Sequence, residues 1–368
     1  MSGGVDSSVS AALLKKEGHD VTGVFMKVWQ PDFLECMQGG DRLDAMRAAA
    51  HIGIPFLTFD FEKEYKKEVI DYMIAEYRVG RTPNPDVMCN KAIKFGAFLK
   101  KAKKMGADMI ATGHYARPRR ISKKLKVRKV KGQELYKLYT GRDSAKDQSY
   151  FLWTLTQEQL RHTLFPVGNY TKPKVREMAR KFGLPNAERK ESQGLCFIGK
   201  IDVKEFLKHY IKEKRGDVLN KKGEVIGFHE GVFFYTIGER RGFTITKKTP
   251  SDKPFYVVAK DVKKNTLTVS SRGRAEFGFT NEVALKNAHW ISGTSPNPKK
   301  TYQARALYRQ PLQEVRIMNN ELRKKNNKAI IHNSKLTVQF KKPQRAISSG
   351  QSLVLYNNEE CLGGGIIS

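Results

Sequence analysis

The sequence predicts an α/β protein with a parallel sheet in its N-terminal part and a small β-barrel in its C-terminal part. Helical and strand patterns alternate through the N-terminal part, and strands separated by helices form parallel sheets that are covered on both faces. From Val283 onward the patterns are those of short, regularly spaced strands, which are typical of a small barrel. The 368 residues are enough for two or three domains.

The N-terminal elements follow from the spacing of apolar residues. Val9, Ala12 and Leu13 share one face of the first helix, and Val24 and Met26 lie on the first strand. The predicted helices are Ser7–Glu17, Leu43–Ile52, Tyr65–Gly80 and Ala92–Met105, and the predicted strands are Asp20–Lys27, Pro55–Phe59 and Met109–Gly113. The later elements of this part are a basic hairpin or loop at Arg117–Lys137 and helices at Gln148–His162 and Lys172–Phe182.

The pattern changes after Cys196. One more helix is predicted at Val203–Lys212. Two hairpins follow, Val218–Ile226 with its turn at Lys222–Gly223 and Phe255–Val269 with its turn at Lys264–Asn265. The strands of the barrel include Ala304–Tyr308, Ala329–His332, Leu336–Phe340 and Ser352–Tyr356.

The charge is strongly unbalanced, with 68 Lys and Arg against 37 Asp and Glu, a net charge of +31. Such a charge attracts polyanions, of which nucleic acid is the usual one; a solvated basic surface without a specific partner is the alternative. No two of the four cysteines form a CxxC pair, and no signal peptide or membrane-spanning apolar run is evident. A cytoplasmic protein that does not contact a membrane is expected, in which any disulfide is transient and catalytic.

The first chemical motif is Ser2-Gly3-Gly4-Val5-Asp6-Ser7-Ser8, which leads directly into a helix. Two glycines let the backbone curl closely around a ligand, and the hydroxyls and free N–H groups at the helix start favour an anion. Asp6 could bind Mg²⁺ through its carboxylate. A glycine-rich turn with a serine helix cap is the alternative.

Two further segments carry cysteines. Gly80–Asn90 has two prolines, which predict a rigid, non-helical loop that presents Asn84, Asp86 and Cys89 toward one point. In such a loop Asn can read a base edge, Asp can move a proton and Cys can attack. Cys196 lies between two glycines, where backbone can approach a ligand. An inert buried residue is the alternative for either cysteine.

The opening string resembles the PP-loop of the ATP pyrophosphatase superfamily, which cleaves ATP to AMP and pyrophosphate. More broadly, the motifs resemble those of the tRNA-specific 2-thiouridylase family, in that family's order and over nearly the whole chain. These motifs are SGGVDSS, GRTPNPDVMCN, ATGHY, KDQSYFL, SQGLCFIG and CLGGGII. The resemblance implies a PP-loop (adenine nucleotide alpha hydrolase-like) ATP-binding domain at 1–195, a small central domain at 196–275 and a tRNA-binding β-barrel at 276–368.

The resemblance also implies an activity, that of a transferase in tRNA processing. Such an enzyme uses ATP with Mg²⁺ to adenylate O2 of the wobble uridine, position 34 of tRNAs for Lys, Glu and Gln, and makes 2-thiouridine. Cys196 would carry the persulfide, Cys89 would assist and form a transient disulfide with Cys196, and Asp86 would be the general acid or base. Asn84, Pro85 and Asp86 would contact the target base. A sulfur-carrier protein or a cysteine desulfurase would supply the sulfur.

Other positions carry over motif by motif. The expected ATP contacts are Ser2, Gly3, Gly4, Val5, Asp6, Ser7, Met26 and Gly113, and the expected tRNA contacts are His114, Lys146, Asp147, Gln148, Leu307, Tyr308 and Gln351. A structural histidine is the alternative for His114, and a solvated turn is the alternative for 146–148. The basic run 119–137 matches no motif and is either a solvated face or a phosphate contact. Cys361 is interpreted as structural, and Cys36 is assigned no role.

The sequence departs from the family pattern at two points. The family has a short apolar strand and a glycine before the motif that begins here at Met1, and we expect the ATP domain to be less stable without that strand. The family also has Arg where Leu307 stands, so this tRNA contact is expected to weaken or to move to Arg305 or Arg309.

Two other functions stay open at this stage. One is another PP-loop tRNA enzyme, such as one that forms 4-thiouridine or lysidine, although the pair Cys89 and Cys196 argues against it. The other is an RNA-binding protein that has lost catalysis, although the intact loop and cysteines argue against it.

Overall fold

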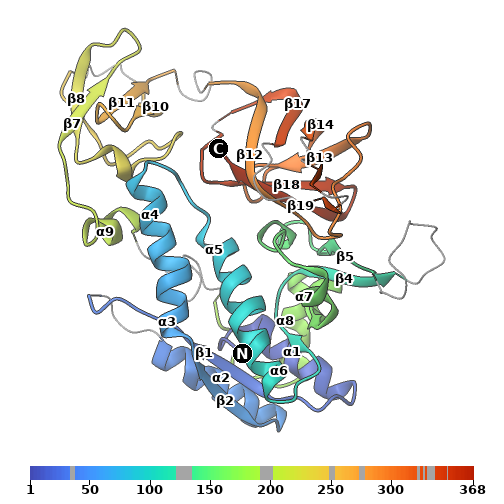
Figure 1. Ribbon diagram of the computed structural model, residues 1–368. Coiled ribbons are helices and arrows are strands. Elements are labelled where there is room, and N and C mark those ends of the chain that lie inside the picture. The colour runs from blue at the N-terminus through green and yellow to red at the C-terminus, as the bar shows by residue number, and fades with distance from the viewer. Residues whose placement is uncertain are drawn as a thin grey trace.

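We analysed a computed structural model of the chain. It describes residues 1–33, 38–121, 135–190, 202–247, 253–272, 278–320, 324–325, 328–329, 336–345 and 347–368. Cys36, Cys196 and most of the basic run, including its residues 122–134, lie outside the described residues. Figure 1 shows helices α4 and α5 rising from the N-terminal domain toward two separate β-domains.

The N-terminal domain pairs parallel strands, as predicted. β1 (Gly23–Lys27) pairs with β2 (Phe56–Asp60), and β3 (Ile110–Ala111) pairs with β6 (Thr163–Leu164), both in parallel. Among the described residues these pairs form two separate two-stranded sheets. The main helices are α1 (Val5–Lys16), α2 (Gln38–Ile52), α3 (Glu62–Tyr65), α4 (Tyr72–Arg78), α5 (Pro85–Met88), α6 (Leu99–Lys104), α7 (Gln157–Arg161) and α8 (Lys172–Lys181). Two π-helical segments, η1 (Lys66–Asp71) and η2 (Cys89–Phe98), and two 3₁₀ turns, η3 (Ser149–Phe151) and η4 (Pro166–Asn169), complete this part.

The central domain is a five-stranded sheet preceded by α9 (Val203–Lys208). Both predicted hairpins are confirmed, since neighbouring strands pair antiparallel. Asn265 has a φ of 54° in the second turn, a conformation that Asn tolerates better than most residues. The strands are β7 (Gly216–Leu219), β8 (Val225–His229), β9 (Thr244–Ile245), β10 (Tyr256–Asp261) and β11 (Thr266–Ser270), with the 3₁₀ turn η5 (Val232–Phe234).

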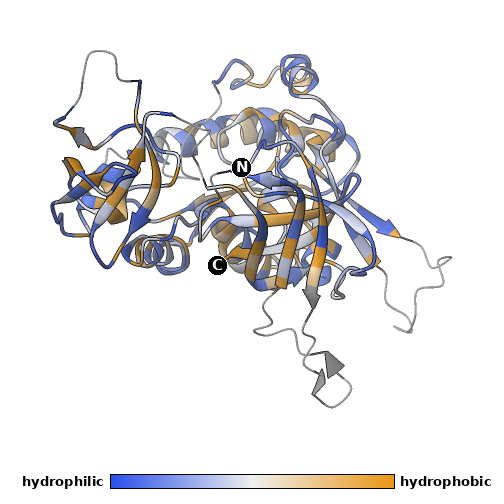
Figure 2. Cartoon of the chain, turned by 90° about the horizontal axis from the view of Figure 1, so that it is seen from above, coloured by the Kyte–Doolittle hydropathy of each residue, from blue (hydrophilic) through white to orange (hydrophobic). Residues whose placement is uncertain are grey.

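The C-terminal domain is the predicted barrel. Its strands are β12 (Thr280–Trp290), β17 (Leu336–Gln344), β14 (Gln313–Asn320), β13 (Thr301–Arg305), β18 (Ser352–Asn357) and β19 (Glu360–Ile367), in that order. Pairing of β12 with β19 closes the ring. Apolar and polar residues alternate along the barrel strands (Figure 2), as expected when one face is buried. Two short strands, β15 (Lys324–Lys325) and β16 (Lys328–Ala329), form a separate two-stranded sheet.

Of the two interpretations of Arg117–Lys137, a basic hairpin or a loop, the described residues fit the hairpin, and its strands join the barrel. β4 (Ala116–Ile121) and β5 (Leu135–Thr140) pair antiparallel, and β5 also pairs with β19. The N-terminal domain therefore contributes two strands to the barrel's sheet. None of the described helices is both long and apolar enough to cross a membrane.

The strand predicted at Ala304–Tyr308 lies earlier, at Thr301–Arg305, and two other predictions of local structure were wrong in kind. Gln148–His162 is not one helix, because a 3₁₀ turn and a further turn at 153–154 precede α7, whose capping box at Thr156 and Gln159 starts the helix late. The segment Gly80–Asn90 is not a loop throughout, because α5 begins at Pro85. Proline is favourable in the first turn of a helix, and Asn84 caps the helix by accepting from Val87 N.

Candidate active site

The phosphate loop has the geometry of an anion site. Gly3 has a φ of 73°, which a side chain would strain. Gly4 is the N-cap of the 12-residue α1, and no side chain occupies the cap position. The free N–H groups of the first turn are therefore available to an anion. Ser2 and Ser7 add hydroxyls 3.3 Å apart at the same place.

Gly113 lies against this loop, so two segments predicted to contact ATP meet. A Cβ on Gly113 would lie 2.8 Å from the Asp6 carbonyl carbon and 2.8 Å from Ser7 N. Only a glycine allows this approach. Met26 lies half-buried on β1, next to the last residue of that strand.

Three residues that sequence reasoning missed support the loop. Asn186 donates to Gly3 O at 2.7 Å and to Ser8 Oγ at 2.9 Å. Arg189 also donates to Gly3 O, at 3.3 Å, and forms ion pairs with two aspartates of α2, Asp41 and Asp44. Lys172 is the third. None of them lies in a glycine-rich or cysteine motif, so no local signal identified them.

Asp6 is already neutralised within the protein. Lys172 Nζ lies 2.7 and 2.8 Å from its two carboxylate oxygens, and Tyr115 Oη donates to Oδ1 at 2.8 Å. Lys172 is only 8% exposed. Within the described ranges no three His, Cys, Asp or Glu side chains gather where a metal ion could bind. The loop thus fits a phosphate group, whereas Asp6 in this arrangement does not offer a Mg²⁺ site.

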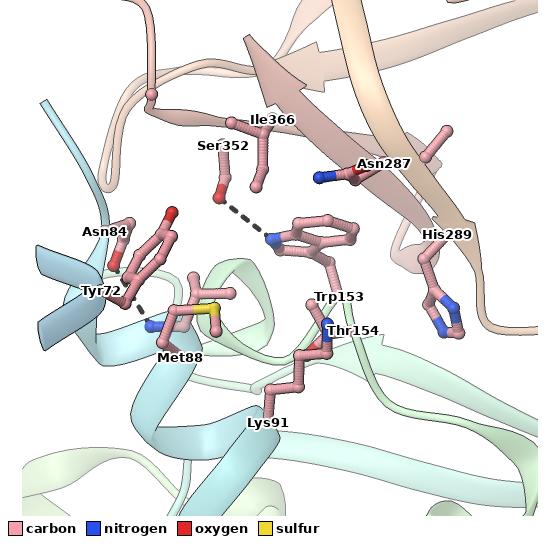
Figure 3. A pocket seen from close by; sticks show the side chains of 13 residues that line it. Tyr72, Asn84, Met88, Lys91, Trp153, Thr154, Asn287, His289, Ser352 and Ile366 are labelled. Carbon is pink, nitrogen blue, oxygen red and sulfur yellow. Dashed lines mark hydrogen bonds between the residues drawn. The ribbon is translucent and has the colours of Figure 1, made fainter. Parts of the chain in front are cut away.

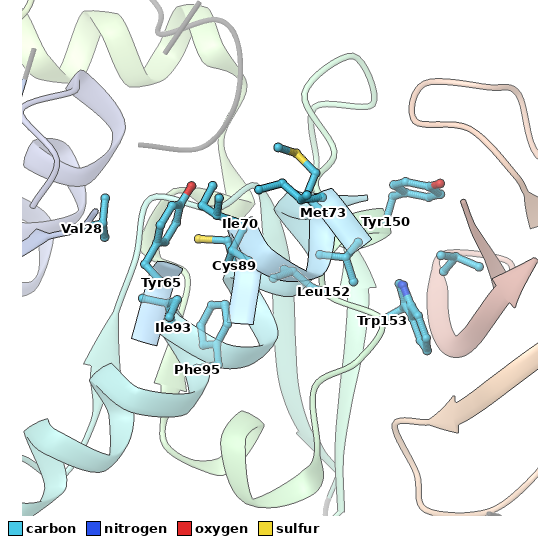
Figure 4. Close-up of a cluster of buried hydrophobic side chains, with 14 of the residues drawn as sticks. Val28, Tyr65, Ile70, Met73, Cys89, Ile93, Phe95, Tyr150, Leu152 and Trp153 are labelled. Atoms are coloured by element: carbon cyan, nitrogen blue, oxygen red, sulfur yellow. The ribbon is translucent and has the colours of Figure 1, made fainter. Parts of the chain in front are cut away.

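Cys89 lies on the inner side of its helix. It is the first residue of η2 and is fully buried. Figure 4 shows it among the apolar side chains of Tyr65, Ile70 and Phe95. It forms no disulfide within the described part of the chain. Cys89 therefore does not face the same side as Asn84, because the helix that starts at Pro85 turns Cys89 inward and leaves Asn84 at the cap.

Asn84 faces a pocket of about 310 Å³ between the N-terminal domain and the barrel. Figure 3 shows Asn84, Met88 and Lys91 on one side and Asn287 and His289 of β12 on the other. Trp153 forms part of the wall and donates to Ser352 Oγ at 3.1 Å. Among the predicted site residues that the structure describes, which exclude Cys196, Asn84 alone lines this pocket.

The residues predicted to contact tRNA fall into two groups. His114 and Asp147 are buried. Desolvation, helped by Lys94, holds the pKa of His114 well below 6.5, so its ring is neutral and its Nδ1 lies 2.7 Å from Thr112 Oγ1. The Asp147 carboxylate accepts from the backbone N–H groups of Gly141 and Ser149. Both side chains face protein partners.

The other group lies nearer the surface. Lys146 is half-buried, and Gln148 Oε1 accepts from Tyr115 N at 3.0 Å. Gln351 Nε2 donates to Pro83 O at 3.3 Å. Tyr308 packs against Phe151 with ring centroids 4.5 Å apart and ring planes tilted by 49°.

Arg305 and Arg309 were the two candidates to replace the tRNA contact at Leu307, and their environments differ. Leu307 is 40% exposed. Arg305 is buried and lies 3.5 Å from the Asp147 carboxylate, whereas Arg309 is exposed and lies over the Tyr308 ring. Of the two, Arg309 is the one that can reach a phosphate.

Cys361 is buried in the barrel on β19, and burial raises the pKa of its thiol far above the usual range. A thiol in that state is unreactive. This environment supports the structural interpretation of Cys361.

Comparison with known proteins covers the whole chain. Residues 1–200 match the family model described as tRNA methyl transferase HUP domain, residues 204–271 match tRNA methyl transferase PRC-barrel domain, and residues 280–367 match Aminomethyltransferase beta-barrel domain. The chain is 43% identical to a protein of Thiobacillus denitrificans over 373 residues, which is 100% of this chain and 98% of that one. It is 43% identical to one of Geobacillus thermodenitrificans and 44% identical to one of Streptococcus pyogenes serotype M3, each time over 100% of this chain and 93% of the relative. All three relatives are named tRNA-specific 2-thiouridylase MnmA.

Proposed function

Because this chain belongs to the tRNA-specific 2-thiouridylase family, we propose that it uses ATP to replace O2 of a tRNA uridine with sulfur. The observation that carries the ATP part is the phosphate loop. Gly113 packs against the first turn of α1, whose N–H groups are uncapped by side chains. The net charge of +31 suits a polyanionic partner such as tRNA.

The reaction needs an activated oxygen. Attack of the uridine O2 on the α-phosphorus of ATP forms an O–P bond and expels pyrophosphate. The N–H groups that follow Gly4 would bind the phosphates, and Gly113 allows its segment to pack closely against the first turn of α1. We propose Asp86, in the first turn of α5, as the residue that moves a proton at the base. Because Asp6 pairs with Lys172, a Mg²⁺ ion would need ligands from ATP itself.

Sulfur then replaces the oxygen. We propose that a persulfide on Cys196 attacks C2, with AMP as the leaving group, which leaves a C2–S–S–Cys196 link. The Cys89 thiolate attacks the sulfur of Cys196, which forms a Cys89–Cys196 disulfide and frees the thiocarbonyl. No external oxidant is needed, because the persulfide sulfur supplies the oxidising equivalent.

Cys89 cannot perform this step while it is fully buried. We therefore propose that the helix carrying Cys89 shifts when tRNA binds. Cys89 begins a π-helical segment, and such segments occur often at functional sites. The uridine would be contacted by Asn84, Pro85 and Asp86, and the anticodon arm by Lys146, Gln148, Tyr308 and Gln351.

Purified protein, tRNA, ATP and a persulfide donor test this function together. We expect AMP and pyrophosphate only when tRNA is present, and 2-thiouridine in the digested tRNA. Asp6→Ala should lower AMP formation but not tRNA affinity, because it disturbs the loop alone. Cys196→Ser should stop thiolation but not adenylation, because a hydroxyl cannot hold a persulfide.

Cys36→Ser is the matched control and should retain activity. A Cys196→Ser variant that still makes 2-thiouridine would contradict the sulfur route. A different product, such as 4-thiouridine, lysidine or a methylated uridine, would assign the chain to another tRNA enzyme. Tight tRNA binding without any AMP would indicate a non-catalytic binder.

A further inference from the structure

The short segment between α4 and α5 is held by all three domains. It begins at Gly80, which ends α4 with a φ of 73°. Gly80 N donates to Tyr77 O at 2.8 Å, and Arg81 N donates to Glu76 O at 2.9 Å. These bonds satisfy the last carbonyls of the helix. The segment then runs through Thr82 and Pro83 to the cap of α5.

The central domain contacts this segment at two points. Val262, in the turn between β10 and β11, packs so closely on Gly80 that a Cβ there would lie 2.3 Å from its Cγ2. The Thr236 hydroxyl lies 3.1 Å from the Thr82 hydroxyl. Thr82 is only 8% exposed, so loss of this hydrogen bond would leave a buried hydroxyl without that partner.

The barrel contacts the opposite side. Thr82 N donates to Ser349 O at 2.8 Å. Gly350, with a φ of 95°, lies so near that a Cβ would be 2.8–3.0 Å from three backbone atoms of Thr82. Gln351 Nε2 donates to Pro83 O. Thr82 is thus held between the central domain and the barrel.

Asp86 lies only four residues beyond Thr82, on helix α5, which starts at Pro85. Thr82 is joined to Asp86 and Cys89 through Pro83 and the capped start of α5, so a shift of Thr82 would also move these two residues. We propose that the central domain is a positioning element for the thiolation chemistry, and that Thr236 and Val262 are its positioning residues. The effect on kcat that this inference predicts rests on the proposed function.

The first test removes one hydroxyl. Thr236→Val keeps the shape of the side chain but cannot hydrogen-bond to Thr82. We expect kcat for 2-thiouridine formation to fall roughly tenfold, as befits one lost buried hydrogen bond, with the KM for tRNA unchanged. Thr236→Ser restores the hydroxyl and should restore kcat. Thr246→Val is the matched control, because Thr246 Oγ1 bonds to Ile226 O within the same domain, and its kcat should equal that of the wild type.

The second test reads the position of Cys89 without any catalysis. We expect Thr236→Val and Val262→Ala to raise the rate of iodoacetamide labelling at Cys89 several-fold, as resolved by mass spectrometry. The rate at Cys361, buried in the barrel, should not change. Labelling at Cys361 that rises equally would mean general unfolding and overturn the inference.

The outcomes separate the two proposals. If the wild type makes no 2-thiouridine, the proposed function fails, and the labelling rates still decide the positioning role. If the wild type is active but Thr236→Val matches Thr246→Val in both kcat and Cys89 labelling, the central domain does not position this segment.

Discussion

Gly113→Ala is the sharpest perturbation of the phosphate loop. The added Cβ would lie 2.8, 2.8 and 2.9 Å from three atoms of Asp6 and Ser7, two of them backbone. Atoms this close must move apart, and the first turn of α1 cannot yield freely because Lys172 and Tyr115 hold Asp6. Overpacking of this kind costs about 1–3 kcal/mol. If that cost falls on the ATP-binding arrangement, ATP affinity drops roughly 5- to 150-fold.

Isothermal titration with ATP measures this drop, and thermal melting shows whether the fold survives. Gly39→Ala is the matched control, because a Cβ at Gly39 in α2 has no neighbour within 4 Å, and its ATP affinity should equal that of the wild type. The tRNA affinity of Gly113→Ala should not change. If Gly113→Ala binds ATP within twofold of the wild type, Gly113 is not part of the phosphate site.

Three more predictions follow from buried or exposed charges. Lys172→Met leaves the carboxylate of Asp6 without its cation. Since Asp6 is partly exposed, we expect the free energy of unfolding to fall by about 2 kcal/mol, below the 3–5 kcal/mol of a fully buried pair. An undiminished urea midpoint would contradict the pairing. His114 has a pKa well below 6.5 in the folded protein. Below pH 6.5 the unfolded chain therefore binds a proton that the folded chain does not, and the stability of the fold falls as the pH falls. Between pH 7 and pH 5.5 we expect His114→Gln to lose less stability in urea melts than the wild type, and equal losses would refute a neutral His114. Arg309→Ala should reduce the slope of log affinity for tRNA against log salt by roughly 0.7–0.9, one phosphate contact, whereas an unchanged slope would exclude Arg309 from the interface.

Local patterns predicted most helices and strands well, because each depends on its own residues. The parallel pairing, the two central hairpins and the barrel are confirmed. The exceptions have physical reasons. Pro85 was taken to exclude a helix, but proline suits the first turn once Asn84 supplies the cap. The segment Arg117–Lys137 was predicted as a basic hairpin or loop, and its place in the barrel's sheet was not foreseen. β5 pairs with β19, a contact across more than half of the chain that no local pattern reveals.

The site residues that lie together in a sequence motif could be predicted. The residues that folding brings to the site from distant parts of the chain could not. The glycines of the phosphate loop and Gly113 came from motifs, and the structure brings them together. Lys172, Asn186 and Arg189 support the same loop from far along the chain. Their residue types are common on any surface, so only the fold identifies them. The burial of Cys89 likewise depends on which face of the helix packs inward.

If this protein puts sulfur on the wobble uridine of tRNA, the 2-thiouridine of a cell depends on its gene. Mass spectrometry of nucleosides from total tRNA tests it most directly, in cells without the gene and in the same cells carrying the wild-type gene or Cys196→Ser. We expect 2-thiouridine derivatives to be absent without the gene, to return with the wild-type copy and to stay absent with Cys196→Ser. Unchanged 2-thiouridine in cells without the gene, or full restoration by Cys196→Ser, would contradict it.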